Sequence, residues 1–255
     1  MTRLRFFGVA TLEIDTESGL RIIVDPFLDD NPASPVKAAD LERVDLMLVT
    51  HASFDHYGQA PDIAKRFGCP VVCGSEVKAL LLDQGVKRDQ LIGLTWGLRA
   101  EVLGVGVQAV ESHHWSFGVT KSGDSVCGPA LGLVVFADPD LRLYINGDTA
   151  LFDGLKLIGR LYRPNIGLVP VAIPDLPGVQ PAVGRLTRGM MSPEEAVLAS
   201  QWLGLEYVIP CHFIDPDCPE VAEFVGALGR LSRADAPRPR LLLLRPGESH
   251  EFESL

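Results

Sequence analysis

The most concentrated chemical signal in this sequence is the segment 50–58, which reads Thr-His-Ala-Ser-Phe-Asp-His-Tyr-Gly. It places three potential metal ligands, His51, Asp55 and His56, within six residues. Imidazole nitrogens and carboxylate oxygens suit zinc, manganese or iron(II). The segment alone is also compatible with a polar loop whose histidines are solvated.

The positions of other ligand-type residues favour the metal interpretation. His114 follows an apolar run that ends near Val110, His212 follows the apolar run 207–210, and Asp148 follows the predicted strand 141–145. Strand ends that lie on one edge of a β-sandwich would bring these side chains together, whereas scattered surface histidines would show no preference for strand ends. The sequence therefore predicts one metal site built from six residues: His51, Asp55, His56, His114, Asp148 and His212.

The elements that must position these residues alternate between strands and helices. Apolar and β-branched runs predict strands at 3–14, 20–24, 46–49, 70–73, 100–110, 131–137, 141–145, 166–171, 207–210 and 240–244. Helices are expected at 58–67, 75–84, 151–162, from Ser192 onward and at 219–232. The strands come in meandering groups with helices between them in both halves. This order favours one α/β (α+β) domain, spanning 1–255, of two sheets flanked by helices over a doubly wound parallel sheet.

Composition narrows the classes of partner. The chain has 33 acidic and 23 basic residues, a net charge of −10, and such a surface repels nucleic acid. No stretch of about 18 apolar residues predicts a membrane helix. Five cysteines without disulfide-like spacing indicate reduced thiols in a cytoplasmic protein. We expect a small-molecule substrate, no nucleic acid and no membrane partner, and the sequence is compatible with a homo-oligomer.

The motif at His51 resembles the HxHxDH signature of the metallo-β-lactamase superfamily. The later landmarks occur in the matching order: a lone histidine at 114, Gly-Asp-Thr at 147–149, and His212 after a strand. The sequence is most similar to the branch that includes ascorbate-6-phosphate lactonase. Its landmarks here are Val-Asp-Pro-Phe at 24–27, Lys-Leu-Ile-Gly at 156–159, Ser-Pro-Glu-Glu-Ala at 192–196 and Ile-Pro-Cys-His at 209–212.

This resemblance implies a four-layered αβ/βα sandwich with a site for one or two metal ions, zinc first and Mn²⁺ or Fe²⁺ as alternatives. It assigns His51 and His114 to a first ion, and Asp55, His56 and His212 to a second, with Asp148 bridging. Asp55 would also orient the attacking water. His114 matches the family's third histidine better than His113 does, because Trp-Ser follows it.

One departure concerns position 53, where the family has its second histidine and this chain has serine. A neutral hydroxyl is a poor zinc ligand beside imidazole, so Ser53 would at best support a neighbouring ligand. The chain would then hold one ion firmly and a second weakly, or one ion only. An inactive protein is also compatible with this change.

The expected reaction is hydrolysis by metal-activated water of a small, anionic or phosphorylated metabolite. The bond would be a lactone or other ester, an amide or a phosphodiester. One alternative is a phospholipase-D-type phosphodiesterase, because the triplet His-Trp-Ser at 114–116 also resembles those members. A second alternative is a non-catalytic, metal-stabilised binding protein.

Several other residues have two readings each. Asp25 is either a partner of a ligating imidazole or an ordinary turn residue. Arg185, Arg188 and Lys121 either meet an anionic substrate or are solvated, and Cys211 is expected to be packed. The irregular segment 174–191 is a candidate substrate-facing loop.

Overall fold

Two seven-stranded sheets dominate the computed structural model, which describes residues 1–174, 176, 183, 189–231 and 238–253. The first sheet has the order β16 (Ser249–Phe252), β1 (Thr2–Gly8), β2 (Thr11–Asp15), β3 (Arg21–Val24), β4 (Leu46–Val49), β5 (Val71–Gly74) and β6 (Leu91–Leu94). The second has the order β15 (Arg240–Leu241), β14 (Tyr207–Cys211), β13 (Ile166–Pro170), β12 (Leu141–Ile145), β11 (Gly132–Asp138), β8 (Val105–Val110) and β7 (Arg99–Val102). A separate two-stranded hairpin consists of β9 (Trp115–Val119) and β10 (Ser125–Pro129).

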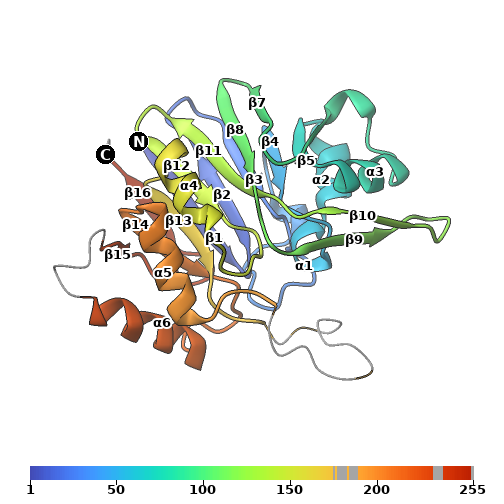
Figure 1. The fold of residues 1–255 in the computed structure, drawn as a ribbon. Helices are drawn as coiled ribbons and strands as arrows, with labels where there is room; N and C mark the ends of the chain where they lie inside the picture. The colour runs from blue at the N-terminus through green and yellow to red at the C-terminus, as the bar shows by residue number, and fades with distance from the viewer. Residues whose placement is uncertain (175, 177–182, 184–188, 232–237, 254–255) are drawn as a thin grey trace.

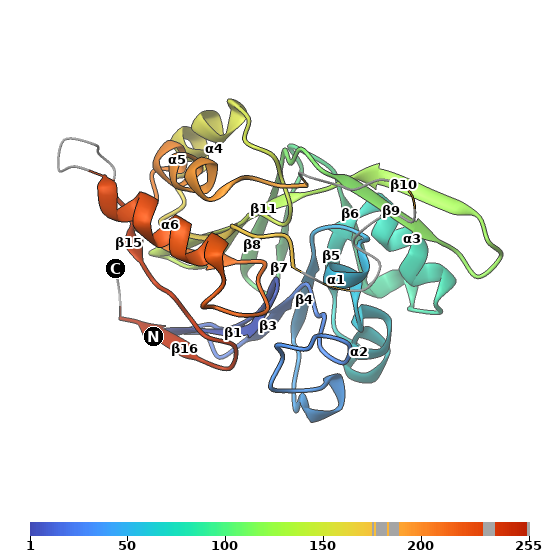
Figure 2. The same ribbon diagram turned by 90° about the horizontal axis from the view of Figure 1, so that it is seen from below.

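Helices lie on the outer faces of the two sheets (Figures 1 and 2). The helices of the first half are α1 (Phe54–Tyr57), α2 (Ala60–Phe67) and α3 (Ser75–Asp83), and those of the second half are α4 (Gly154–Tyr162), α5 (Pro193–Leu203) and α6 (Pro219–Arg230). Two short 3-10 helices span Ala38–Asp40 and Arg88–Gln90. Helices α2 and α3 contact the first sheet at β4 and β5, and α5 contacts the second at β13. The expected arrangement of helices, sheet, sheet and helices is confirmed.

Strand β4 shows why such runs are apolar on both faces. Leu46 and Leu48 belong to the core between the sheets, whereas Met47 and Val49 belong to the core beneath α2 and α3. Successive side chains of a strand point to opposite faces, so a strand between two apolar layers needs apolar residues at every position. All four side chains are fully buried.

The chain departs from the prediction at residues 3–14, which form two antiparallel strands and not one. Gly8 and Val9 have φ angles of 95° and 54°, a left-handed turn that reverses the chain between β1 and β2. The backbone of Val9 is paired in both directions: its N–H donates to Phe213 O, and its carbonyl accepts from His212 N at 2.6 Å. These two hydrogen bonds hold the segment that carries His212 against the turn.

Other boundaries shift by a few residues. The helix expected at 58–67 is α2, which begins at residue 60, and the short helix α1 precedes it. The helix expected at 151–162 begins at Gly154, and the strand expected at 240–244 ends at Leu241. The segment 174–191 lies largely outside the described residues. No helix among the described residues is long and apolar enough to cross a bilayer.

Candidate metal centre

The six predicted ligands all follow strand ends on one edge of the molecule. His51 follows β4 directly, and the next turn, α1, carries Asp55 and His56. In the second sheet, β12, β13 and β14 are parallel, and β8 runs in the same direction because β11 is antiparallel to both β8 and β12. His114, Asp148 and His212 therefore leave the same edge of that sheet as the chain emerges from β8, β12 and β14.

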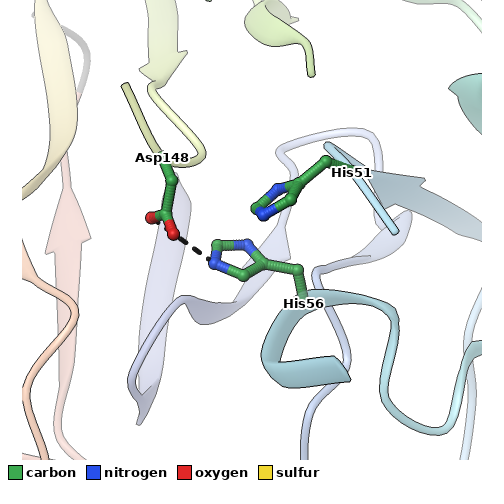
Figure 3. A group of neighbouring side chains, drawn as sticks. All are labelled: His51, His56 and Asp148. Carbon is green, nitrogen blue, oxygen red and sulfur yellow. Dashed lines mark ion pairs between the residues drawn. The ribbon is translucent and has the colours of Figure 1, made fainter. Parts of the chain in front are cut away.

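The side chains converge into two overlapping triads. One contains His51, His56 and Asp148, and the other contains Asp55, His56 and His212; in each, the three ligand atoms lie within 4.8 Å of one another. Figure 3 shows the first triad, with His56 facing both the His51 ring and the Asp148 carboxylate. The distance from His56 Nε2 to Asp148 Oδ1 is 3.5 Å. The second triad contains the three residues predicted for the second ion, and the division of ligands between two ions stays a prediction.

His212 and His114 complete the cluster. His212 Nε2 lies 3.3 Å from Asp55 Oδ2 and 3.3 Å from Asp148 Oδ2. His114 Nε2 lies 3.8 Å from Asp148 Oδ2, and its ring centroid is 5.2 Å from that of His51. Asp148 thus lies within 3.8 Å of His56, His114 and His212, and it shares the first triad with His51.

Two atoms at the centre have no hydrogen-bond partner among the described residues: His51 Nε2 and Asp148 Oδ1. Both residues are almost fully buried. Buried polar atoms are nearly always satisfied, by protein, water or a ligand. A divalent metal ion binds imidazole nitrogens and carboxylate oxygens. Here one of each lacks a hydrogen-bond partner and lies beside three further imidazoles, so the residues present fit such an ion.

Asp25 supports the metal centre through hydrogen bonds to His56 and Thr50. It is fully buried, and its Oδ2 accepts from His56 Nδ1 and from the Thr50 hydroxyl, both at 2.8 Å. Its Oδ1 accepts from Thr50 N at 2.7 Å. With Nδ1 engaged as a donor, His56 has Nε2 free to act as a ligand. His212 is oriented in the same way, because its Nδ1 lies 2.9 Å from Ala172 O.

Two residues of the metal centre have strained backbone conformations. Asp25 and His212 have φ angles of 44° and 68°, which side chains other than glycine rarely adopt. Such conformations persist only where surrounding contacts hold them, and they cluster at functional sites. Here the carbonyl of Asp25 accepts from the Thr11 hydroxyl at 2.7 Å, and the N–H of His212 donates to Val9 O.

The neighbouring histidines at 113 and 114 have separate surroundings. His113 stacks on Phe152 with ring centroids 4.3 Å apart, and its Nε2 lies 2.7 Å from Glu111 Oε1. His114 turns toward Asp148. Of this pair, only His114 is in a position to join the cluster.

Ser53 contacts one of the predicted ligands. Its hydroxyl donates to Asp55 Oδ1 at 2.5 Å. The backbone N–H of the adjacent Ala52 donates to Ser116 Oγ at 2.9 Å, and Ser116 in turn donates to Glu76 Oε1 at 2.7 Å. The loop that carries the motif is therefore anchored to β9 and α3. The motif-based reasoning did not identify Glu76, and nothing in its sequence neighbourhood marks it.

Comparison with known proteins agrees with this geometry. The profile of the beta-lactamase superfamily domain matches residues 20–213. A UPF0173 metal-dependent hydrolase of Rubrobacter xylanophilus is 32% identical over 252 residues, which cover 97% of this chain and 95% of that protein. The chain belongs to this family of metal-dependent hydrolases.

A second relative supports the family assignment, and a solved structure supports the fold. A UPF0173 metal-dependent hydrolase of Koribacter versatilis is 35% identical over 213 residues, covering 83% of this chain and 84% of that protein. The solved structure of a metallo hydrolase from the archaeon Ignicoccus hospitalis superposes with a TM-score of 0.76 at 25% identity, covering 99% of this chain and 100% of that one. The metallo-β-lactamase fold expected from the sequence is therefore confirmed.

The electrostatics of the hydrolase centre favour ionised carboxylates. Burial by itself would raise the pKa of Asp148, but His212, His56 and His51 outweigh it and hold that pKa well below its usual range. Asp55 behaves in the same way: burial opposes the shift, and the hydrogen bond to His212 and the charge of His56 lower its pKa. Both carboxylates are thus ready to bind a cation at neutral pH.

The pKa values of the buried histidines differ because their carboxylate neighbours differ. Burial lowers the pKa of His51 well below its usual value, and the nearby His56 adds to this. His56 and His212 are buried too, but Asp148 and a second carboxylate, Asp25 or Asp55, raise their pKa values. A neutral His51 keeps a lone pair available, which ligation requires.

The remaining predicted residues lie elsewhere or outside the described part of the hydrolase. Arg185 and Arg188 are not among the described residues. Lys121 is exposed at the tip of the β9–β10 hairpin, where its backbone N–H donates to Asp83 Oδ2 at 2.9 Å. Cys211 is buried in the core between the sheets, as expected, and burial raises the pKa of its thiol.

Proposed function

We propose that this hydrolase cleaves an ester-type bond, with a lactone as the first candidate, in a small molecule bound at the His51–Asp148 cluster. The observation that carries the proposal is a pair of buried atoms without a hydrogen-bond partner, His51 Nε2 and Asp148 Oδ1, within the cluster of six residues. The resemblance of the landmarks at 24–27, 147–149 and 192–196 to ascorbate-6-phosphate lactonase supports a lactone over an amide. The anionic or phosphorylated character of the substrate rests on the same resemblance and stays a prediction, and its candidate contacts Arg185 and Arg188 are not among the described residues.

The six residues would hold one or two divalent ions, zinc first and Mn²⁺ or Fe²⁺ as alternatives. A bound ion supplies a Lewis acid and lowers the pKa of water from 15.7 toward about 7. The chain itself supplies orientation. Asp25 and Ala172 O hold the Nδ1 protons of His56 and His212, so that both Nε2 atoms face the cluster.

Asp55 is the residue that would accept the proton of the attacking water. The Ser53 hydroxyl occupies its Oδ1, and Oδ2 faces the cluster beside His212. A carboxylate held in this way presents one oxygen to the cluster, where it could orient a water molecule and take its proton. Asp55 would then return this proton to the leaving alcohol oxygen.

The two alternative functions have less support. The triplet at 114–116 resembles phospholipase-D-type members, but Ser116 is engaged between Ala52 N and Glu76, a packing role that explains its presence without a phosphodiester substrate. The binding-protein alternative rests on Ser53.

We also propose a cytoplasmic location, which is supported by free cysteines at 69, 73, 127, 211 and 218.

The test pairs metal analysis with a substrate panel. Purified protein is dialysed, its metal content is measured, and hydrolysis of lactones, simple esters and phosphodiesters is assayed. We expect at least one ion per chain and activity on lactones or esters. Asp148→Asn should lose both, and Asp153→Asn, an exposed aspartate on the surface, should lose neither. A metal-loaded protein that binds lactones without turnover would favour the binding-protein alternative.

A further inference from the structure

An apolar groove of about 850 Å³ lies directly beside the metal centre. Its walls come from the motif loop and α1 on one side, and from α3 and the β9–β10 hairpin on the other. None of the described residues that line it carries a charge. This volume is within the range of pockets that bury a small molecule.

The hairpin that forms one wall is fitted onto α3. A Cβ at Gly118 would lie 2.4 Å from Leu80 Cδ1, and a Cβ at Gly128 would lie 2.3 Å from the Glu76 carboxylate. Glycine at these two positions therefore lets the strands approach the helix. Ser116, between them on the same face, bonds to Glu76. The hairpin is positioned by these contacts and belongs to neither large sheet (Figures 1 and 2).

The other face of the hairpin is apolar and exposed. Phe54 of α1 and Trp115, Phe117 and Val119 of β9 are 42%, 65%, 48% and 52% exposed, and all four line the groove. A strand that packs one face on a helix would ordinarily present polar side chains to water on the other. Exposed apolar side chains gathered in one hollow indicate an interaction site, and a ligand groove is one such site.

The groove and the metal centre share one loop, although none of the six predicted ligands lines the groove. Ala52 and Ser53 line it, and they lie in sequence between the ligands His51 and Asp55. Ser53 also donates to Asp55. On the opposite wall, the Trp115 ring lies with its centroid 6.0 Å from that of His114. A molecule whose reactive carbonyl is at the cluster would therefore extend its substituent into the groove.

We propose that this groove binds a hydrocarbon substituent of the substrate, so that the preferred substrates are esters or lactones with an alkyl chain or ring of several carbons. The inference rests on the proposed function for the bond that is cleaved. For a lactone, a water oxygen bonds to the carbonyl carbon, the ring C–O bond breaks, and the ring oxygen takes the proton. The product is the hydroxy acid, and no other reactant is consumed.

The first experiment measures binding without catalysis. N-phenyl-1-naphthylamine, a neutral probe that fluoresces in apolar surroundings, is titrated into the metal-loaded protein. We expect saturable binding, displacement by γ-dodecalactone, and much weaker displacement by γ-valerolactone. Phe117→Asp and Trp115→Ala should each weaken probe binding at least tenfold. The control Leu161→Asp changes a residue of α4 that is 59% exposed and does not line the groove, and it should bind like wild type.

The second experiment measures kcat/KM for γ-lactones whose alkyl substituent grows from one to eight carbons. Each methylene buried in the groove should raise kcat/KM about fourfold until the groove is filled, the equivalent of about 0.8 kcal/mol per methylene. Phe117→Asp should flatten this dependence, and Leu161→Asp should keep it.

The outcomes separate the two proposals. Probe binding that Phe117→Asp abolishes, without hydrolysis of any lactone or ester, supports the groove and contradicts the proposed function. Hydrolysis that is independent of chain length, without probe binding, overturns the groove proposal and leaves the function intact. If the wild type is dimeric, and Phe117→Asp converts it to a monomer without changing the chain-length dependence, a second copy of the chain covers this face and the proposal fails.

Discussion

The Ser53 hydroxyl donates a hydrogen bond to the Asp55 carboxylate, with Oγ 2.5 Å from Oδ1. Serine thus takes the position of the histidine that the superfamily signature places two residues after His51, and it acts on a neighbouring ligand. The substitution removes one imidazole from the metal centre and leaves Asp55 oriented. It also adds a small side chain to the wall of the apolar groove.

Restoring the histidine should change metal stoichiometry. Ser53→His should raise the retained metal toward two ions per chain, because the His51/His114 side would gain a strong ligand. The wild type should retain about one ion after the same dialysis, as measured by elemental analysis. Ser53→Ala is the matched control and should stay near one. Two firmly held ions in the wild type would show that serine is no handicap.

Asp25→Asn should weaken metal binding without touching a predicted ligand. The amide can replace only part of the carboxylate's contacts with Thr50 and His56, and loss of such an outer partner costs about 10–100-fold in metal affinity. The buried donors left unpaired should also lower the free energy of unfolding by about 1–3 kcal/mol. Chelator competition and urea denaturation measure the two effects. Asp153→Asn is the control, and equal affinities in both variants would contradict the role of Asp25.

Gly58 and Gly68 end helices α1 and α2, and replacing each with alanine gives a matched pair of variants. A Cβ at Gly58 (φ 36°) would lie 2.4 Å from Pro26 O and 2.6 Å from Phe27 Cα, whereas a Cβ at Gly68 (φ 65°) meets nothing within 4 Å. Gly68→Ala should therefore cost only the left-handed conformation, about 1–2 kcal/mol.

Gly58→Ala should cost several kcal/mol more, because backbone must move, and it should reduce metal affinity by displacing α1, which carries Asp55 and His56. Thermal unfolding and metal titration test both effects. Similar losses in the two variants would show that the close approach at Gly58 is unimportant.

Glu76 should make stability depend on pH. Burial raises the pKa of this carboxyl above its ordinary 4.5. The protonated form is therefore favoured in the folded state, and the associated stability is fully present below about pH 4.5 and is lost as pH rises through the raised folded pKa. Glu76→Gln should be more stable than wild type at pH 7–8, and the difference should shrink toward pH 4. Parallel denaturation profiles would contradict this, and Glu101→Gln on exposed β7 controls for the change of net charge.

Local sequence determined the strands and most of the helices. The run at 46–49 is apolar at every position because β4 lies between two apolar layers, and the capping pattern at Ser192 opens α5 as expected. The ligand types and their order along the chain also followed from sequence. His51, His114, Asp148 and His212 could be recognised because each follows a strand, and a strand end is visible as a change from apolar to polar residues.

Only the tertiary structure decided which atoms meet. The sharing of His56 between two triads, the support of His56 by Asp25 from 31 residues away, and the packing of β9–β10 on α3 all join segments that are distant in sequence. Sequence patterns report the periodicity of one element, whereas these contacts depend on the relative positions of several. The alternation of Trp115, Phe117 and Val119 is a strand pattern, but its exposure, and therefore the groove, depends on which face the glycines of the hairpin press against α3.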